Sequence, residues 1–229
     1  MEQFEHESAL AHFLGGLGLH LPDHVVMAAF VVVFLSVLAL LFRPRIRVEQ
    51  PGSLQLVLEA AVGGLIGMLK ENVGEKGRPF LGLVGTLGLF ILVSNLLGLI
   101  PFFSSPTVNL NMPVGCALVS FIYYNYQGIK EQGLVHYLAH FLGPVLPLAV
   151  VMLPIEIISH ISRVLSLSIR LFGNIFGEEL VVLVLASLIP FVVPVPMMLF
   201  GVFGSLLQSF VFIMLTMIYL GGAVAAEEH

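Results

Sequence analysis

Cysteine and charged residues are scarce in this sequence. Its single cysteine, Cys116, excludes an internal disulfide and any cysteine-based metal cage. Because Cys116 lies in the apolar run VGCALVSF, we interpret it as a packing residue. Lys, Arg, Asp and Glu make up only 10% of the 229 residues, and 58% are hydrophobic. In soluble domains roughly a quarter of all residues are charged, so this composition predicts an integral membrane protein.

Three absent patterns narrow the function classes. No Lys or Arg precedes Arg43, whereas a secretory signal starts with a basic segment, so we expect the N-terminus to be mature as written. No GxSG-like elbow lies near a histidine, which argues against an intramembrane hydrolase with an activated nucleophile. The RLFGN segment has no second copy, which argues against an autonomous secondary transporter built from repeated halves.

The apolar runs predict an all-α membrane protein with about five membrane helices in a single membrane domain, 1–229. Three spans are expected over 25–42, 80–100 and 113–127, the last flanked by tyrosines that suit the membrane–water interface. In 53–71 the apolar residues recur every three or four positions with polar residues opposite them. That pattern predicts an amphipathic helix lying in the interface.

Two long helices are predicted for the last third of the chain, over 147–189 and 197–226. The proline-free part 155–189 alone would measure about 50 Å, and the second helix about 45 Å, against a hydrocarbon core of about 30 Å. Either both helices are broken, or both are strongly tilted as a hairpin. We favour the tilted hairpin, because such helices could wrap a curved partner.

The distribution of basic residues predicts the orientation in the membrane. Seven of the nine Lys and Arg residues fall on one side of the predicted spans: Arg43, Arg45, Arg47, Lys70, Lys76, Arg78 and Lys130. By the positive-inside rule that side is cytoplasmic. We therefore expect the N-terminus outside and the C-terminus in the cytoplasm.

Ionisable groups inside the long apolar segment mark the candidate site. Arg170 is the clearest, because an arginine at mid-bilayer costs about 2.5–3.5 kcal/mol on insertion scales and usually faces a bundle interior or a water-filled cavity. At 100° per residue Arg170 belongs to a polar stripe about 80° wide. The other members of the stripe are Glu156, His160, Arg163, Asn174 and Glu178. Glu179 lies roughly opposite Arg170.

A line of small residues runs beside this stripe and would let another helix approach closely. Its members are Ser159, Ser162, Ser166, Gly173 and Gly177. On the last helix Gln208 is the main polar group, with Ser205 and Ser209 beside it, and it could hydrogen-bond Arg170. We therefore predict an ion path met by a close-packed partner. Carboxylates and histidine exchange protons, whereas a permanently charged arginine acts as an electrostatic barrier.

Each of these residues also has a structural interpretation, and these alternatives stay open. Arg163 could snorkel to the cytoplasmic surface, His160 and Gln208 could join helices by hydrogen bonds, Glu178 could pair with a cation, and Arg170 could form a salt bridge with Glu156 or Glu179. His136 and His140 have i, i+4 spacing but no acidic third ligand nearby, so we expect an interfacial location and no metal site. Asn95 is expected to form an interhelical hydrogen bond.

Four segments resemble subunit a of the F-type ATP synthase, the stator of the membrane Fo sector. SLSIRLFGNIFGEEL resembles the family's signature around its essential arginine. LVSNLLGLIP, PIEIIS and LLQSFVFIMLTMIYL match in order and spacing, so the resemblance covers essentially the whole chain.

The resemblance implies an ion-translocating stator without an ATP site or cofactor of its own. Arg170 would separate two aqueous half-channels and release the proton from each passing c-ring carboxylate. Glu179 matches the family's acidic half-channel residue, and Glu156 another carboxylate of the proton path. Asn174 matches the polar neighbour after the arginine, and Gln208 its contact on the last helix. Na⁺ in place of protons stays an alternative, because the ring's binding site largely decides the ion.

The implied partners are the c-ring, the peripheral-stalk b subunits, the rest of the ATP synthase and the lipid bilayer, with no nucleic acid. We expect a multi-pass protein of a bacterial inner membrane. Two positions depart from the pattern of some relatives. This chain has Gly201 where those relatives carry a His or acidic group, and Gly98 where they carry an acidic residue. We expect Glu178 to compensate for the group missing at Gly201.

Overall fold

The structure is a computed structural model that describes residues 22–45, 52–100, 103–133, 137, 149–188 and 194–224. Within these ranges every regular element is helical, with six α-helices and three short 3-10 segments. The predicted all-α architecture is confirmed for this part of the chain. His136 and His140 lie outside the described residues.

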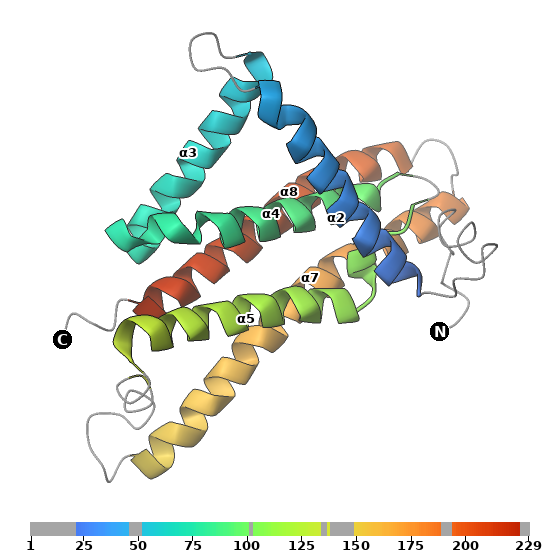
Figure 1. The fold of residues 1–229 in the computed structure, drawn as a ribbon. Coiled ribbons are helices and arrows are strands. Elements are labelled where there is room, and N and C mark those ends of the chain that lie inside the picture. Colours follow the sequence, from blue (N-terminus) through green and yellow to red (C-terminus); the bar gives the residue numbers. More distant parts are fainter. Residues whose placement is uncertain are drawn as a thin grey trace.

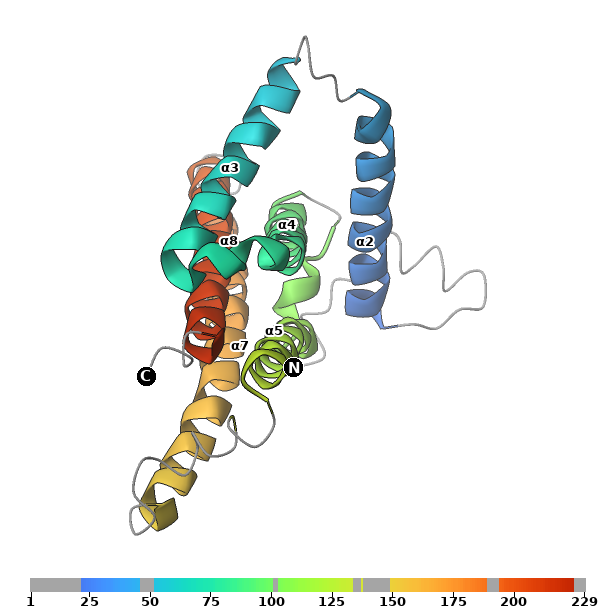
Figure 2. The same ribbon diagram turned by 60° about the vertical axis from the view of Figure 1, so that its left-hand side comes forward.

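The first two helices diverge from the rest of the molecule (Figures 1 and 2). Helix α2 spans Asp23–Phe42 and continues into the 3-10 turn η2, Arg43–Arg45. Only its first half is buried, against α4 and the turn η4, Pro106–Val108. Its second half exposes a run of large apolar side chains, which suits a lipid environment.

Helix α3 spans Ser53–Val73 and ends at Gly74, whose φ of 87° is a backbone conformation that favours glycine. The Gly74 N–H donates to the Lys70 carbonyl and closes the last turn. The 3-10 segment η3, Glu75–Phe80, then turns the chain into α4, Leu81–Leu97. Only the last turns of α3 are buried.

The remaining helices form an elongated bundle in which α8 is central. Helix α5 spans Asn111–Gln132, α7 spans Ala149–Leu188 and α8 spans Pro194–Val224. Helices α7 and α8 are 40 and 31 residues long and lie side by side in opposite directions (Figure 1). The first half of α7 projects beyond α5 (Figure 2).

Five described helical segments are long and apolar enough to cross a membrane: Asp23–Phe42, Ser53–Val73, Gly77–Leu97, Val150–Ser187 and Pro196–Val224. Their number agrees with the prediction, but their membership differs. The amphipathic helix α3 qualifies by length and composition, whereas α5, predicted as a span over 113–127, does not. Polar side chains on α5 that bond to its neighbours lower its hydropathy. The interfacial position of α3 stays a prediction.

Two apolar clusters hold the bundle together around α8. The first joins α3, η3, α4, α5 and α8, and includes Leu69, Tyr124 and Leu220. The second joins α4, α5, α7 and α8, and Cys116 is buried in it, as predicted. Burial of these side chains is the main stabilising contribution.

One end of the bundle collects basic residues and is called here the basic end. There the C-terminal ends of α3, α5 and α8 meet, as Figure 1 shows. The Gln132 Nε2 donates to the Ala223 carbonyl at 2.7 Å, and Gly221 packs against the Asn72 carbonyl. Lys70 and Lys130 lie in the last turns of the helices that end there.

Candidate functional site

Helix α7 has one face packed in the bundle and one face uncovered. Leu167, Leu171 and Ile175 are buried against α5 and α8. The line of small residues lies on the other side: Ser162, Ser166 and Gly173 are exposed, and Ser159 and Gly177 are half-buried. The polar stripe runs along the boundary between the two faces.

Toward the basic end, the stripe begins with a three-residue cluster of Glu156, His160 and Tyr124. The His160 Nε2 lies 3.4 Å from a Glu156 carboxylate oxygen one turn earlier. The His160 Nδ1 lies 2.9 Å from the Tyr124 hydroxyl on α5. His160 is buried and Glu156 half-buried, so this ionisable pair sits at the rim of the core. A helix–helix hydrogen bond, one of the interpretations left open for His160, is present.

Arg163 contacts an aromatic ring, and no carboxylate of the described residues forms an ion pair with it. Its guanidinium carbon lies 5.1 Å from the centroid of the Tyr219 ring on α8, which is a cation–π contact. This contact ties the first half of α7 to the last turns of α8.

Arg170 is exposed on the uncovered face of α7. Its Nη2 donates to the Ser166 hydroxyl at 3.4 Å. In the described part of the chain no carboxylate lies within ion-pair distance of Arg170, so neither Glu156 nor Glu179 forms the salt bridge left open above. The hydrogen bond that Gln208 could have made to Arg170 is not formed in this structure, because Gln208 is buried in α8 while Arg170 points away from the core.

Glu178 faces α8 at the site of Gly201. A Cβ atom added at Gly201 would collide with the Glu178 carboxylate, and one at Gly204 would lie 3.6 Å from it. The carboxylate therefore occupies the space that the missing side chain of Gly201 leaves. Glu178 Oε1 is buried, and it has no hydrogen-bond partner among the described residues.

Asn174 and Glu179 flank Glu178 with different surroundings. Asn174 is exposed, and its Nδ2 would lie 3.8 Å from a Cβ atom at Gly204. Glu179 is half-buried and is turned by about 100° from its neighbour around the helix. The structure thus directs the two adjacent carboxylates to different sides of α7.

A second group of buried polar residues lies between α4, α8 and η4. Asn95 accepts from the Thr107 hydroxyl at 2.8 Å, and the Ser105 hydroxyl donates to the Ser94 carbonyl at 2.9 Å. Asn95 was expected to form an interhelical hydrogen bond, and its partner Thr107 lies in the short 3-10 helix η4 rather than in a second α-helix. Ser94 Oγ, Asn95 Nδ2 and, on α8, Ser205 Oγ are buried without a partner among the described residues.

The contacts of α4 with α8 bring this group to the level of Glu178. Gly88 packs against Ile213, and Leu99 lies against Gly201, so the two helices run antiparallel. This register sets Ser94 and Asn95 beside Ser205, one turn from Gly201. Sequence reasoning missed Ser94, Ser105 and Thr107, and their only signal was polarity next to an apolar helix end.

Along α7 the groups follow a simple order. The Glu156–His160–Tyr124 cluster comes first, Arg170 follows about 15 Å farther on, and Glu178 lies about 12 Å beyond Arg170, at 1.5 Å per residue. Ionisable side chains therefore lie on both sides of a fixed positive charge. No group of three His, Cys, Asp or Glu residues that could hold a metal is found in the described ranges.

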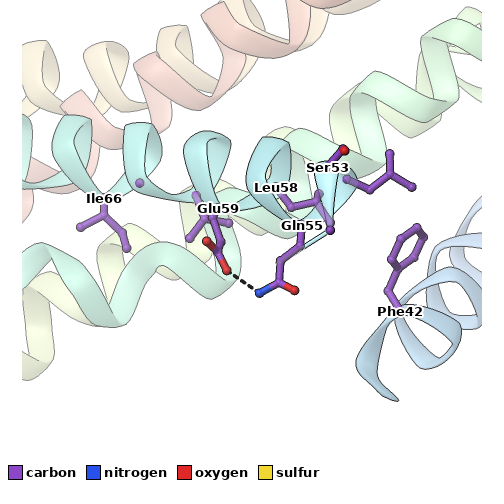
Figure 3. Close-up of a pocket in the computed structure, with 10 residues that line it drawn as sticks. Phe42, Ser53, Gln55, Leu58, Glu59 and Ile66 are labelled. Carbon is purple, nitrogen blue, oxygen red and sulfur yellow. Dashed lines mark hydrogen bonds between the residues drawn. The ribbon is translucent and has the colours of Figure 1, made fainter. Parts of the chain in front are cut away.

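The open pocket in Figure 3 is separate from this arrangement. It has a volume of about 730 Å³ and is lined by Phe42 at the end of α2 and by residues of α3 and the preceding Gly52, including Gln55 and Glu59. The Gln55 amide donates to Glu59 at 2.7 Å. No lining residue belongs to α7 or α8, so this pocket is not part of the polar stripe.

Comparison with known proteins gives consistent matches. The family described as ATP synthase A chain matches residues 24–221. An ATP synthase subunit a of Geotalea daltonii is 46% identical over 220 residues, which cover 95% of each chain. A subunit a of Aliarcobacter butzleri is 44% identical over 97% of this chain and 99% of its own. ATP synthase subunit a 1 of Pelobacter propionicus is 53% identical over 78% of this chain and 77% of its own.

Proposed function

This chain belongs to the ATP synthase A chain family, and from that membership we infer that it carries ions through the stator of the enzyme's membrane sector. It is a multi-pass membrane subunit of the rotary ATP synthase, and its partner is the rest of that complex. We further propose that protons pass between this chain and the c-ring by two half-channels separated by Arg170.

The observation that carries the proposal is that Arg170, on a face of small residues, has no carboxylate partner among the described residues. A guanidinium left facing lipid would be costly, so a partner is expected to cover it. A c-ring helix that brings a carboxylate would supply a charge for Arg170, and the serines and glycines beside it would allow close contact. Because Arg170 stays protonated, it would favour the ionised carboxylate and so release its proton.

The groups on either side of Arg170 support the two half-channels. Buried polar atoms without protein partners commonly bind ordered water. Ser94, Asn95, Ser205 and Glu178 supply such atoms beyond Arg170, away from the basic end. We propose that they line the outer half-channel and that Glu179 exchanges its protons.

The inner half-channel would run past Glu156 and His160. These residues lie toward the basic end, which the positive-inside rule assigns to the cytoplasm. The C-terminus is accordingly proposed to be cytoplasmic and the N-terminus external, in a bacterial inner membrane. Na⁺ stays the alternative ion. The b subunits of the peripheral stalk are the further proposed partners.

Glu178 is proposed to supply the ionisable group missing at Gly201. Its carboxylate lies in the space where a side chain from that position of α8 would lie. The exchange of positions would keep a carboxylate between α7 and α8. Asn174 and Gln208 are proposed to supply polar groups beside Arg170, on α7 and α8 respectively.

Cysteine cross-linking tests which partner covers the uncovered face. In a Cys116→Ala background of the whole complex, Ser166→Cys is expected to form a disulfide with a cysteine introduced into the outer helix of the ring subunit. Ser168→Cys is the matched control, because Ser168 is only 1% exposed and bonds to the Val164 carbonyl. Cross-linking from neither position, or equally from both, would contradict the proposed ring contact.

A further inference from the structure

The His160 imidazole is held between two oxygen atoms from two helices. Its Nδ1 lies 2.9 Å from the Tyr124 hydroxyl of α5, and its Nε2 lies 3.4 Å from Glu156. His160 is only 8% exposed and Tyr124 only 2%. The hydroxyl therefore occupies one ring nitrogen and turns the other toward the carboxylate.

Phe121 packs edge-on against the rings of both Tyr124 and His160. Its ring stands at 84° to the Tyr124 ring and at 78° to the His160 ring, with centroids 5.4 and 5.9 Å away. The Tyr124 and His160 rings are nearly parallel to one another, at 19°. These two neighbouring rings limit the directions in which the imidazole can turn.

Within the described ranges, the other ionisable groups facing this cluster come from α7, α8 and the residue Tyr137. They are Arg163 on α7, Tyr219 on α8, and Tyr137 beyond the end of α5. Arg163 lies over Tyr219, whose ring is 6.1 Å from that of Tyr124. Glu156 lies in ion-pair range of Nε2.

A hydroxyl group suits both protonation states of the imidazole. In a proton exchange between Nε2 and Glu156, Nδ1 keeps its proton and donates to the Tyr124 hydroxyl oxygen in both states, because an imidazolium that gives its Nε2 proton to ionised Glu156 becomes the neutral Nδ1–H tautomer. In both states Nε2 keeps its position beside Glu156, because a hydrogen bond at one ring nitrogen sets the role of the other. The pair could then pass a proton between Nε2 and the carboxylate without turning the ring.

We propose that Tyr124 is a positioning residue of the inner ion path, which holds the His160 imidazole so that Nε2 exchanges a proton with Glu156. This inference rests on the proposed function. It assigns to α5 a direct part in setting the rate and the pH dependence of conduction, although its side chain carries no proton of the path.

The test uses passive proton conduction in membrane vesicles that contain the whole complex, stripped of its catalytic sector. Tyr124→Phe removes one oxygen atom and keeps the ring against Phe121. It is expected to lower the rate about three- to tenfold, or about 0.7–1.4 kcal/mol at 1.36 kcal/mol per factor of ten, and to shift the pH–rate profile. Rates are normalised to the amount of assembled complex.

Two comparisons separate positioning from general structural damage. Tyr123→Phe removes the neighbouring hydroxyl, whose ring packs edge-on against Phe80, and is expected to leave rate and profile unchanged. In a His160→Ala background, Tyr124→Phe is expected to have no further effect, because the group that it positions is gone. An equal loss in both backgrounds, or no loss from Tyr124→Phe in the native background, would overturn the proposal.

Arg170→Ala in the same vesicles separates a failure of the Tyr124 positioning role from a failure of the proposed stator function. If conduction responds to Arg170→Ala but Tyr124→Phe behaves like Tyr123→Phe, the positioning role fails while the stator function stands. If proton conduction responds to none of these substitutions, both are wrong.

Discussion

The surroundings of Arg170 and Glu178, in addition to their charges, mark them as candidate functional residues. Arg170 has a serine for its partner within the chain, and Glu178 has the bare backbone of a glycine beside it. Its identity as an isolated charge in an apolar helix made Arg170 predictable from sequence. The family resemblance led us to expect that Glu178 compensates for the group missing at Gly201. Their contact joins residues 23 positions apart, so its geometry follows only from the packing of α7 on α8.

Substitutions at Glu178 and Glu179 test whether both adjacent carboxylates take part in the outer half-channel. Substitution of either by alanine is expected to lower ATP-driven proton pumping by about 100-fold, the lower range of acid–base catalysis. Glu71→Ala, which removes an exposed carboxylate from α3, is the control and should pump normally. Intact pumping in Glu178→Ala beside complete loss in Glu179→Ala would show that Glu178 does not replace the group missing at Gly201.

At the scale of the helices, hydrophobic length was the dependable signal. The runs over 25–42, 147–189 and 197–226 correspond to α2, α7 and α8 within a few residues, because continuous apolar sequence encodes a helix locally. Helix α5 was harder, since the polar groups that lower its hydropathy bond to other helices. Tyr124 to His160 and Ser120 to Thr216 are such bonds. Pairings of this kind depend on tertiary packing and leave no local pattern.

The contact between α3 and α8 gives a prediction at this scale. Gly221→Ala is expected to lower the free energy of unfolding by about 1–3 kcal/mol, because its Cβ would collide with the Asn72 carbonyl. The melting midpoint of this subunit, measured in the purified complex, should then fall by roughly 2–4 °C for each kcal/mol lost.

Gly222→Ala is the matched control for this substitution, since a Cβ at Gly222 would meet no atom within 4 Å. The two variants share the same helix propensity change, so their difference isolates the contact with α3. Equal midpoints for the two variants would contradict the close approach of α3 and α8.

At the scale of the whole molecule, the bundle is complete on one side and open on the other. Helices α4, α5 and α8 bury one another, whereas α7 leaves Arg170 and the small residues uncovered, and α2 and α3 expose apolar side chains. A membrane accounts for exposed apolar surface, but it does not account for an exposed arginine. The molecule therefore has the form of a subunit that functions against a partner.

The central claim is that Arg170 lies on the ion path, and ATP-driven acidification of inverted membrane vesicles tests it most directly. The comparison is between the native complex, Arg170→Ala and, as a control, Arg78→Ala, which removes an exposed positive charge from η3, outside the polar stripe. Subunit levels are first confirmed to be equal. Loss of acidification in Arg170→Ala, with most of it retained in Arg78→Ala, is the predicted result, whereas normal acidification in Arg170→Ala would contradict the account.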